Sequence, residues 1–277
     1  MFRPHDVPAV HFLLSLIEPG HASRVRRHLR IGKPARLSAK HAAWQLDRLD
    51  APRSVLLWML ERDDPATNQL VYHQARTDDP LKRDILRGLP FGTAIAPLPV
   101  PARCEQRNCA HTEPDLPPGP HGLIGGLREA RTLRSARAAV RAVSKRDWAT
   151  VAEADRREPL PGFARWALAE RIDCPPEVRT RFGSHRKFTN RLRAAGIVEP
   201  REYVELGRPP EDVLAVLYFG TKLFPHRAGE AAALLAPLVR AELGANLDAW
   251  AALADLVPGF AGTVPELVTA GGAATRE

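Results

Sequence analysis

The sequence predicts an all-α fold, a solenoid-like array of short helical repeats in one or two lobes. Helix starts recur at Pro52, Pro65 and Pro80, each directly after an Asp or an Asp-Ala pair, about every fourteen residues. The 277 residues include 26 prolines and 19 glycines, which suit short and often interrupted helices. Only 6% of the residues are aromatic, so we expect a core built mainly from Leu, Ala and Val.

The Asp-Pro pairs have a physical reason to begin helices. An Asp side chain accepts hydrogen bonds from the unpaired N–H groups of the first turn, and its charge suits the positive end of the helix. Proline fits the first helical position, where no intrahelical partner exists for an N–H group. The array therefore covers residues 52–88.

The remaining elements follow in order along the chain. We expect a first helix over 8–17, then one over 38–49 with Ser38 as its N-cap. Eight prolines between 89 and 120 predict a linker or long loop. Further helices are expected at 123–144, 147–156, 161–171, 176–182, 185–195, 210–222, 227–243, 246–256 and 264–269. The predicted organisation is thus an N-terminal lobe (1–88), the linker (89–120), a C-terminal lobe (121–270) and a frayed tail (271–277).

The positive charge is unevenly distributed. The formal net charge is +8, with 34 Lys and Arg against 22 Asp and Glu in residues 1–199, and six against ten in residues 200–277. Residues 21–48 carry eight positive side chains and one negative one, including Arg26, Arg27 and Arg30. This layout indicates an anionic partner, although a solvated surface in an arginine-rich protein would give the same count.

The helix expected at 123–144 has a clear amphipathic pattern. Leu133, Ala136, Val140 and Val143 share one face. The opposite face carries cations that we expect to contact phosphates as a ladder: Arg131, Arg134, Arg137, Arg141 and Lys145. Glu129 is the one acidic residue within the helix expected at 123–144, so we expect almost no acid to neutralise this face. The alternative is a core helix whose solvent face is rich in arginine.

Two segments resemble known families. Trp58, Glu61-Arg62-Asp63 and Pro65 are echoed by Trp166, Glu170-Arg171, Asp173 and Pro175, and with the Asp-Pro starts they resemble HEAT-type or leucine-rich-repeat-variant repeats over 37–88 and 147–195. This resemblance implies a curved solenoid that binds partners on one face, and it implies no reaction.

The second resemblance is local. The run from Phe182, with Leu192-Arg-Ala-Ala-Gly-Ile-Val198 at its end, resembles the recognition helix of winged-helix regulators, and residues 202–206 would form a wing strand. It implies major-groove contacts from Arg186, Lys187, Asn190 and Arg191. The Pro175-Pro176 pair departs from that pattern, and an ordinary basic repeat helix is the alternative.

One loop contains residue types that zinc accepts. Cys104-x4-Cys109-x-His111, with His121 ten residues later, is a weak metal candidate because its spacing matches no standard zinc site. A loop with two incidental thiols, or a local disulfide, explains it equally. No other cofactor is expected, because phosphate-binding, nucleophile-elbow and metalloprotease motifs are absent from the sequence. The five tryptophans are expected as core anchors: Trp44, Trp58, Trp148, Trp166 and Trp250.

The function predicted from these features is non-enzymatic binding through a basic surface, with nucleic acid as the favoured ligand. A scaffold for an acidic protein is the first alternative. A helical-repeat DNA glycosylase is the second, and it would need an acidic residue beside aromatic side chains in a positive cleft. The apolar run at 12–17 is too short for a membrane span, so we expect a cytoplasmic protein without a membrane partner.

Overall fold

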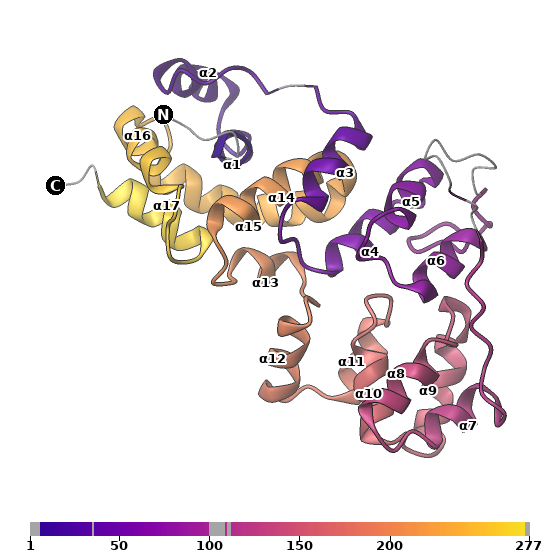
Figure 1. The fold of residues 1–277 in the computed structure, drawn as a ribbon. Helices are drawn as coiled ribbons and strands as arrows, with labels where there is room; N and C mark the ends of the chain where they lie inside the picture. Colours follow the sequence, from indigo (N-terminus) through magenta and orange to yellow (C-terminus); the bar gives the residue numbers. More distant parts are fainter. Residues whose placement is uncertain (1–5, 35, 100–108, 110–111, 275–277) are drawn as a thin grey trace. The chain divides into compact units, whose positions relative to one another are not determined.

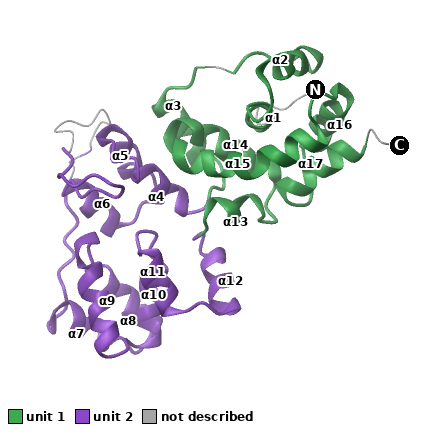
Figure 2. Cartoon of the chain, turned by 180° about the vertical axis from the view of Figure 1, so that it is seen from behind, with its two compact units in different colours: residues 1–51, 198–277 green, residues 52–197 purple. Residues whose placement is uncertain are grey.

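A computed structural model describes residues 6–34, 36–99, 109 and 112–274. Within these residues all regular structure is helical, with seventeen α-helices, one 3₁₀ turn and no strand, which confirms the all-α fold class (Figure 1). The chain divides into two compact units, one formed by residues 1–51 and 198–277 and the other by residues 52–197 (Figure 2). No helix in the described part is long and apolar enough to span a bilayer.

Unit 1 is assembled from both ends of the chain. Its core is α14, which contacts α1, α3, α13, α15 and α17. Most side chains of α14 are buried, including Leu214, Val216 and Leu217. A helix that is apolar on nearly every side needs neighbours all round, and the surrounding helices supply them. The helices of unit 1 are α1 (Asp6–Leu14), α2 (Pro19–His28), α3 (Ala39–Asp47), α13 (Pro200–Val204), α14 (Pro210–Leu223), α15 (Pro225–Glu242), α16 (Leu247–Leu256) and α17 (Val264–Ala273).

Unit 2 consists of helices that are consecutive in sequence. Neighbouring helices pack in pairs, with α4 against α5, α5 against α6 and α10 against α11, while α8 packs across the chain onto α10. The elements are α4 (Ser54–Leu60), α5 (Pro65–Tyr72), α6 (Asp79–Leu86), α7 (Gly122–Arg128), α8 (Leu133–Val140), the 3₁₀ turn η1 (Lys145–Asp147), α9 (Trp148–Arg157), α10 (Gly162–Ala169), α11 (Pro176–Phe182) and α12 (Arg186–Ala194).

Three helices have the side-chain N-caps that the sequence predicts. The Asp64 carboxylate accepts from the Thr67 N–H at 3.0 Å, and α5 begins at Pro65. Asp78 caps α6 by accepting from the Leu81 N–H, and Ser38 caps α3. The start predicted at Pro52 is wrong by two residues, because Asp50 forms an ion pair with Arg208 at 2.7 Å instead of capping α4.

The long helix expected at 123–144 is wrong: the segment forms α7 and α8 with a break at 129–132. The reason lies in the break itself. Thr132 caps α8 through a reciprocal pair of hydrogen bonds with Ser135, and this capping box starts a new helix where a continuous one would have run.

The boundaries of the two units also differ from the expected lobes, since they fall after residues 51 and 197. The proline-rich segment belongs within unit 2, and its described part, 89–99 and 112–120, contains no helix. The Asp63 carboxylate holds this segment by accepting from the backbone N–H groups of Phe91, Gly92 and Ala94 at 2.7–2.9 Å. Farther along, Glu113 pairs with Arg87 at 2.6 Å. The described part of this segment is therefore fixed to unit 2 by charged side chains.

Candidate functional site

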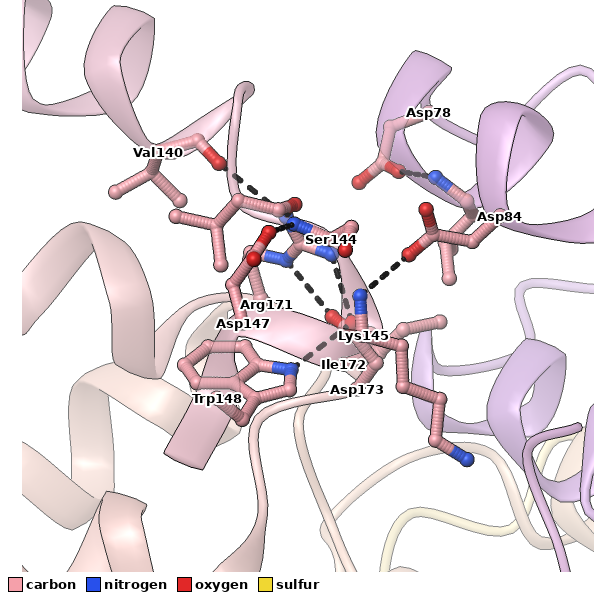
Figure 3. A network of polar contacts seen from close by, with 12 residues as sticks. Asp78, Asp84, Val140, Ser144, Lys145, Asp147, Trp148, Arg171, Ile172 and Asp173 are labelled. Atoms are coloured by element: carbon pink, nitrogen blue, oxygen red, sulfur yellow. Dashed lines mark hydrogen bonds and ion pairs between the residues drawn. The ribbon is translucent and has the colours of Figure 1, made fainter. Parts of the chain in front are cut away.

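A buried polar network lies at the C-terminal end of α8 in unit 2 (Figure 3). Arg83 donates to the carbonyls of residues 141, 142 and 143 at 3.3, 3.1 and 2.8 Å. Arg171 donates to the carbonyls of Val140, at 3.2 Å, and Val143. The last carbonyls of a helix have no intrahelical partner, so two buried arginines satisfy those at the end of α8.

Two carboxylates balance these arginines. Asp84 accepts from Arg83 Nε at 3.1 Å and from the N–H of Lys145 at 2.8 Å, while Asp173 accepts from Arg171 at 2.7 and 2.8 Å and from the Trp148 indole at 3.2 Å. Burial raises the pKa of Asp84 more than its cationic neighbours lower it. Burial acts in the same direction on Asp173, but Arg171 and the Trp148 hydrogen bond outweigh it, so the pKa of Asp173 is lowered. Because each of these buried charges has a partner, the network acts as a structural frame.

A groove of about 400 Å³ lies beside this frame, between α6, α8 and α10. Its rim is lined by three ion pairs, Arg53 with Asp78 at 3.2 Å, Arg137 with Glu170 at 2.8 Å and Arg141 with Asp79 at 2.5 Å. No aromatic side chain lines this groove. A glycosylase-type site needs an acidic group beside aromatic side chains, and the groove offers only carboxylates already paired with arginine.

Three of the five cations in the predicted phosphate ladder therefore already have interaction partners within unit 2. Glu170 and Asp79, which lie far from α8 in sequence, neutralise Arg137 and Arg141. Hydrogen bonding to Glu170 raises the pKa of Arg137. Lys145 is half-buried, donates to the Pro90 carbonyl and lies 4.9 Å from the Phe91 ring, and burial lowers its pKa.

Two cations of the ladder keep the predicted exposure. Arg131 and Arg134 are exposed, and neither has an ion-pair partner among the described residues. The expectation that acids are absent from this face is thus wrong, because the neutralising carboxylates come from other helices. These carboxylates, Glu170 and Asp79, are not among the residues near α8 in sequence.

The second predicted cluster lies on α12. Phe188 and Leu192 are buried, with the Phe188 ring edge-on to Trp166 at 5.3 Å, and His185 caps the helix. The exposed side chains of the helix include the predicted contacts Arg186, Lys187, Asn190 and Arg191, and the Arg191 guanidinium carbon lies 5.7 Å from the centre of the Trp166 ring.

The wing strand predicted after α12 is wrong. Residues 200–204 form helix α13, and Tyr203 and Val204 are buried in unit 1. Pro200 stands at the first helical position, and Glu199 and Glu202 form a capping box, so the local sequence favours a helix start. The winged-helix resemblance is consequently limited to the exposed basic face of α12.

The third predicted cluster, the basic stretch at 24–40 with Arg26, Arg27 and Arg30, lies in unit 1. We extend it through α3 to Arg48 and call residues 24–48 the basic segment. Cations recur at every third position, and all five are exposed: Arg24, Arg27, Arg30, Lys33 and Arg36. None of these five side chains has an ion-pair partner within the described part of the chain. Arg26 is partly buried and donates to Ser23 at 3.2 Å.

The backbone of the basic segment leaves α2 in a defined way. Arg30 adopts a left-handed conformation with φ of 54°, and the Ile31 N–H donates to the Arg26 carbonyl at 3.0 Å. This is the hydrogen bond of a Schellman helix end. The described residues between Arg30 and α3, 31–34 and 36–38, form no regular structure (Figure 1), and most of their side chains are exposed. The three predicted clusters thus differ in how much of their charge is still available.

The metal candidates are not brought together by the described residues. Cys104 and His111 lie outside them, Cys109 is partly exposed, and His121 lies 3.3 Å from Glu129. Among the described residues no group of three or more His, Cys, Asp or Glu could hold a metal ion. Cys174 is buried, and burial raises the pKa of its thiol to about 12, so it is a poor nucleophile.

Comparisons with known proteins identify no relative. No protein family matches the chain, and neither a curated protein nor a solved structure is significantly similar to it.

Proposed function

We propose that this chain is a non-enzymatic nucleic-acid-binding protein whose main contact surface is the basic segment. One observation carries the proposal. Residues 24–48 hold eight Lys and Arg and one acidic residue, so their net charge of +7 accounts for nearly all of the +8 of the whole chain. The rest of the chain, with 32 Lys and Arg against 31 Asp and Glu, is almost neutral.

The availability of these charges supports the same conclusion. Some exposed arginines elsewhere, such as Arg137 and Arg141, are held by carboxylates, whereas five cations of the basic segment lack such partners among the described residues. A polyanion gains most where cations are already unpaired, because no internal ion pair must break. Arginine also suits phosphate, since its planar group can donate two parallel hydrogen bonds.

The expected binding is independent of sequence and sensitive to salt, because phosphate contacts release counterions. The exposed face of α12 provides a second contact surface through Arg186, Lys187 and Arg191. In the predicted ladder, Arg134 on α8 and Arg131 just before it can contribute without breaking an ion pair within the described residues.

The proposal also includes a HEAT-like repeat within unit 2. We assign the α4–α5 and α10–α11 pairs to a HEAT-like repeat, in which a Trp lies on the first helix and a Glu-Arg pair ends it. Support comes from the turns, where Asp63 and Asp173 each hold several hydrogen-bond donors. Helical repeats commonly bind partners along an extended surface, which suits a linear polyanion.

The test is a salt titration with a labelled oligonucleotide, read by fluorescence anisotropy. The variant Arg24→Gln/Arg27→Gln/Arg30→Gln removes three exposed cations of the basic segment. Removing three phosphate contacts should lower the slope of log Kd against log salt by about 2 for a single strand, and weaken binding at all salt concentrations.

The matched control also removes three positive charges, but each of them is engaged in an exposed ion pair: Arg87→Gln/Arg141→Gln/Arg156→Gln. Its salt slope should stay at the wild-type value. If both variants lose the same affinity, the overall charge matters and the basic segment is not the site. If polyglutamate competes as well as nucleic acid of equal charge, the partner is an acidic protein.

A further inference from the structure

Trp44 is the exposed tryptophan of this protein. Its exposed fraction is 53%, against 2% for Trp58, 5% for Trp148 and 0% for Trp250. The prediction that all five tryptophans anchor the core is therefore wrong for Trp44. An indole this open to water offers apolar area and a ring face that a partner can cover.

The packing of α3 explains why Trp44 is exposed. Ala42, Ala43 and Leu46 are buried, and α3 contacts α14. Trp44 lies off this buried stripe, so α3 does not need it for packing. Ser38 caps the helix, which fixes the backbone that carries the indole.

The neighbours of the indole are a cation and an imidazole. The Arg48 guanidinium carbon lies 4.7 Å from the centre of the Trp44 ring, a cation–π distance. The His41 ring centre lies 5.9 Å away and tilted by 42°. An indole with a guanidinium over one face suits a ligand that stacks a flat ring on the other face and carries negative charge next to the guanidinium.

Trp44 also lies inside the basic segment. Arg30, Lys33 and Arg36, which have no ion-pair partner among the described residues, are exposed and precede α3 in sequence. A linear ligand that follows the chain past these cations would next meet α3, the helix that carries the indole. The ligand chemistry is then a phosphate backbone next to a flat heterocycle, which describes a nucleotide.

We infer that the basic segment takes single-stranded nucleic acid, with Trp44 as the platform on which an unpaired base stacks. This inference rests on the proposed function and specifies its ligand. In a duplex the faces of the bases are stacked on one another, so an exposed indole gains nothing from them. In a single strand every base offers a face, and stacking on aromatic side chains is tolerant of sequence.

The experiment compares a labelled oligothymidylate, an oligouridylate of the same length and a DNA duplex. Trp44→Ala should weaken binding to both single strands by about fivefold or more, the lower range for loss of one stacked base, and leave duplex binding unchanged. Trp44→Phe should restore most of the affinity, because a smaller ring still stacks. Phe163→Ala is the matched control, since Phe163 is 49% exposed on α10, outside the basic segment.

A second readout uses the indole itself. Single-stranded ligand should quench the tryptophan fluorescence of the wild-type protein and protect it from iodide, and Trp44→Phe should abolish both effects. The variant retains Trp58, Trp148 and Trp250 in buried positions and the partly buried Trp166, which lies 5.7 Å from Arg191, so a remaining response would come from Trp166 on the second contact surface.

The outcomes separate the two proposals. If the wild-type protein binds no nucleic acid at low salt, the proposed function fails, and this inference fails with it. If it binds nucleic acid but Trp44→Ala reduces single-strand and duplex affinity equally, or neither, the stacking role is refuted while the phosphate-binding function stands. If polyglutamate binding also depends on Trp44, the surface is a protein interface.

Discussion

Replacing Arg171 with Met should be one of the most damaging single substitutions in unit 2. Arg171 is buried, donates to Asp173 at 2.7 and 2.8 Å, and holds carbonyls at the end of α8. Arg171→Met leaves Asp173 buried, with the Trp148 indole as its remaining side-chain donor, and leaves the Val140 carbonyl without its arginine. Breaking a buried pair on one side costs about 3–5 kcal/mol, a large share of the stability of a domain.

Urea denaturation followed by circular dichroism measures this cost, because the substitution should shift the transition of unit 2. Arg156→Met is the control: it removes an exposed ion pair with Glu153 and should leave the midpoint nearly unchanged. The double variant Arg171→Met/Asp173→Asn should recover part of the loss, since the isolated buried charge is gone. A cost below about 1 kcal/mol for Arg171→Met, or no recovery in the double variant, would refute this reasoning.

Two further predictions concern stability. Asn tolerates the φ of 51° that Asp63 adopts, so Asp63→Asn does not strain the backbone. It removes the negative charge that accepts three backbone N–H groups, and the free energy of unfolding should fall by about 1–3 kcal/mol. Hydrogen exchange of the Phe91 and Gly92 amides should accelerate. His11 is buried against Tyr218 with an unpartnered Nδ1, and burial and then Arg26 lower its pKa below 6.5. The unfolded state therefore binds more protons, and the stability of the wild type should fall below about pH 6.5, with a slope of at most about 1.4 kcal/mol per pH unit that His11→Phe removes. A pH-independent wild type, or amide exchange unchanged in Asp63→Asn, would contradict these two expectations.

The part of the fold that follows from local chemistry was predictable from the sequence. Asp64, Asp78 and Ser38 cap helices in the way their side chains dictate, and the all-helical class follows from their repetition. The pairing of the two chain ends in unit 1 was not predictable, because α1 packs on α14 across some two hundred residues. Apolar faces show that a helix needs a partner, but they do not show which one.

The candidate site shows the same division. The spacing on α8 correctly placed Ala136 and Val140 inside and Arg131 and Arg134 outside. It missed the acids that face Arg137 and Arg141, because Glu170 and Asp79 reach α8 through tertiary packing. Trp44 was misread for a related reason. Its apolar character resembles that of Trp58, and only the docking of α3 on α14 decides that one indole faces water.

The number of arginines is therefore a poor guide to function in this chain. Whether each guanidinium group already has a partner within the fold is a better one. Many of its guanidinium groups bind backbone carbonyls: Arg83 and Arg171 hold those of α8, Arg179 those of residues 169, 171 and 172, and Arg240 that of Leu16. These side chains stabilise helix ends and turns, and they are already occupied. The five exposed cations at positions 24, 27, 30, 33 and 36 of the basic segment hold no such carbonyls among their described contacts, although the segment contains almost the entire net charge. An arginine engaged with its own backbone serves the fold, and one left in water beside an exposed indole is available to a ligand.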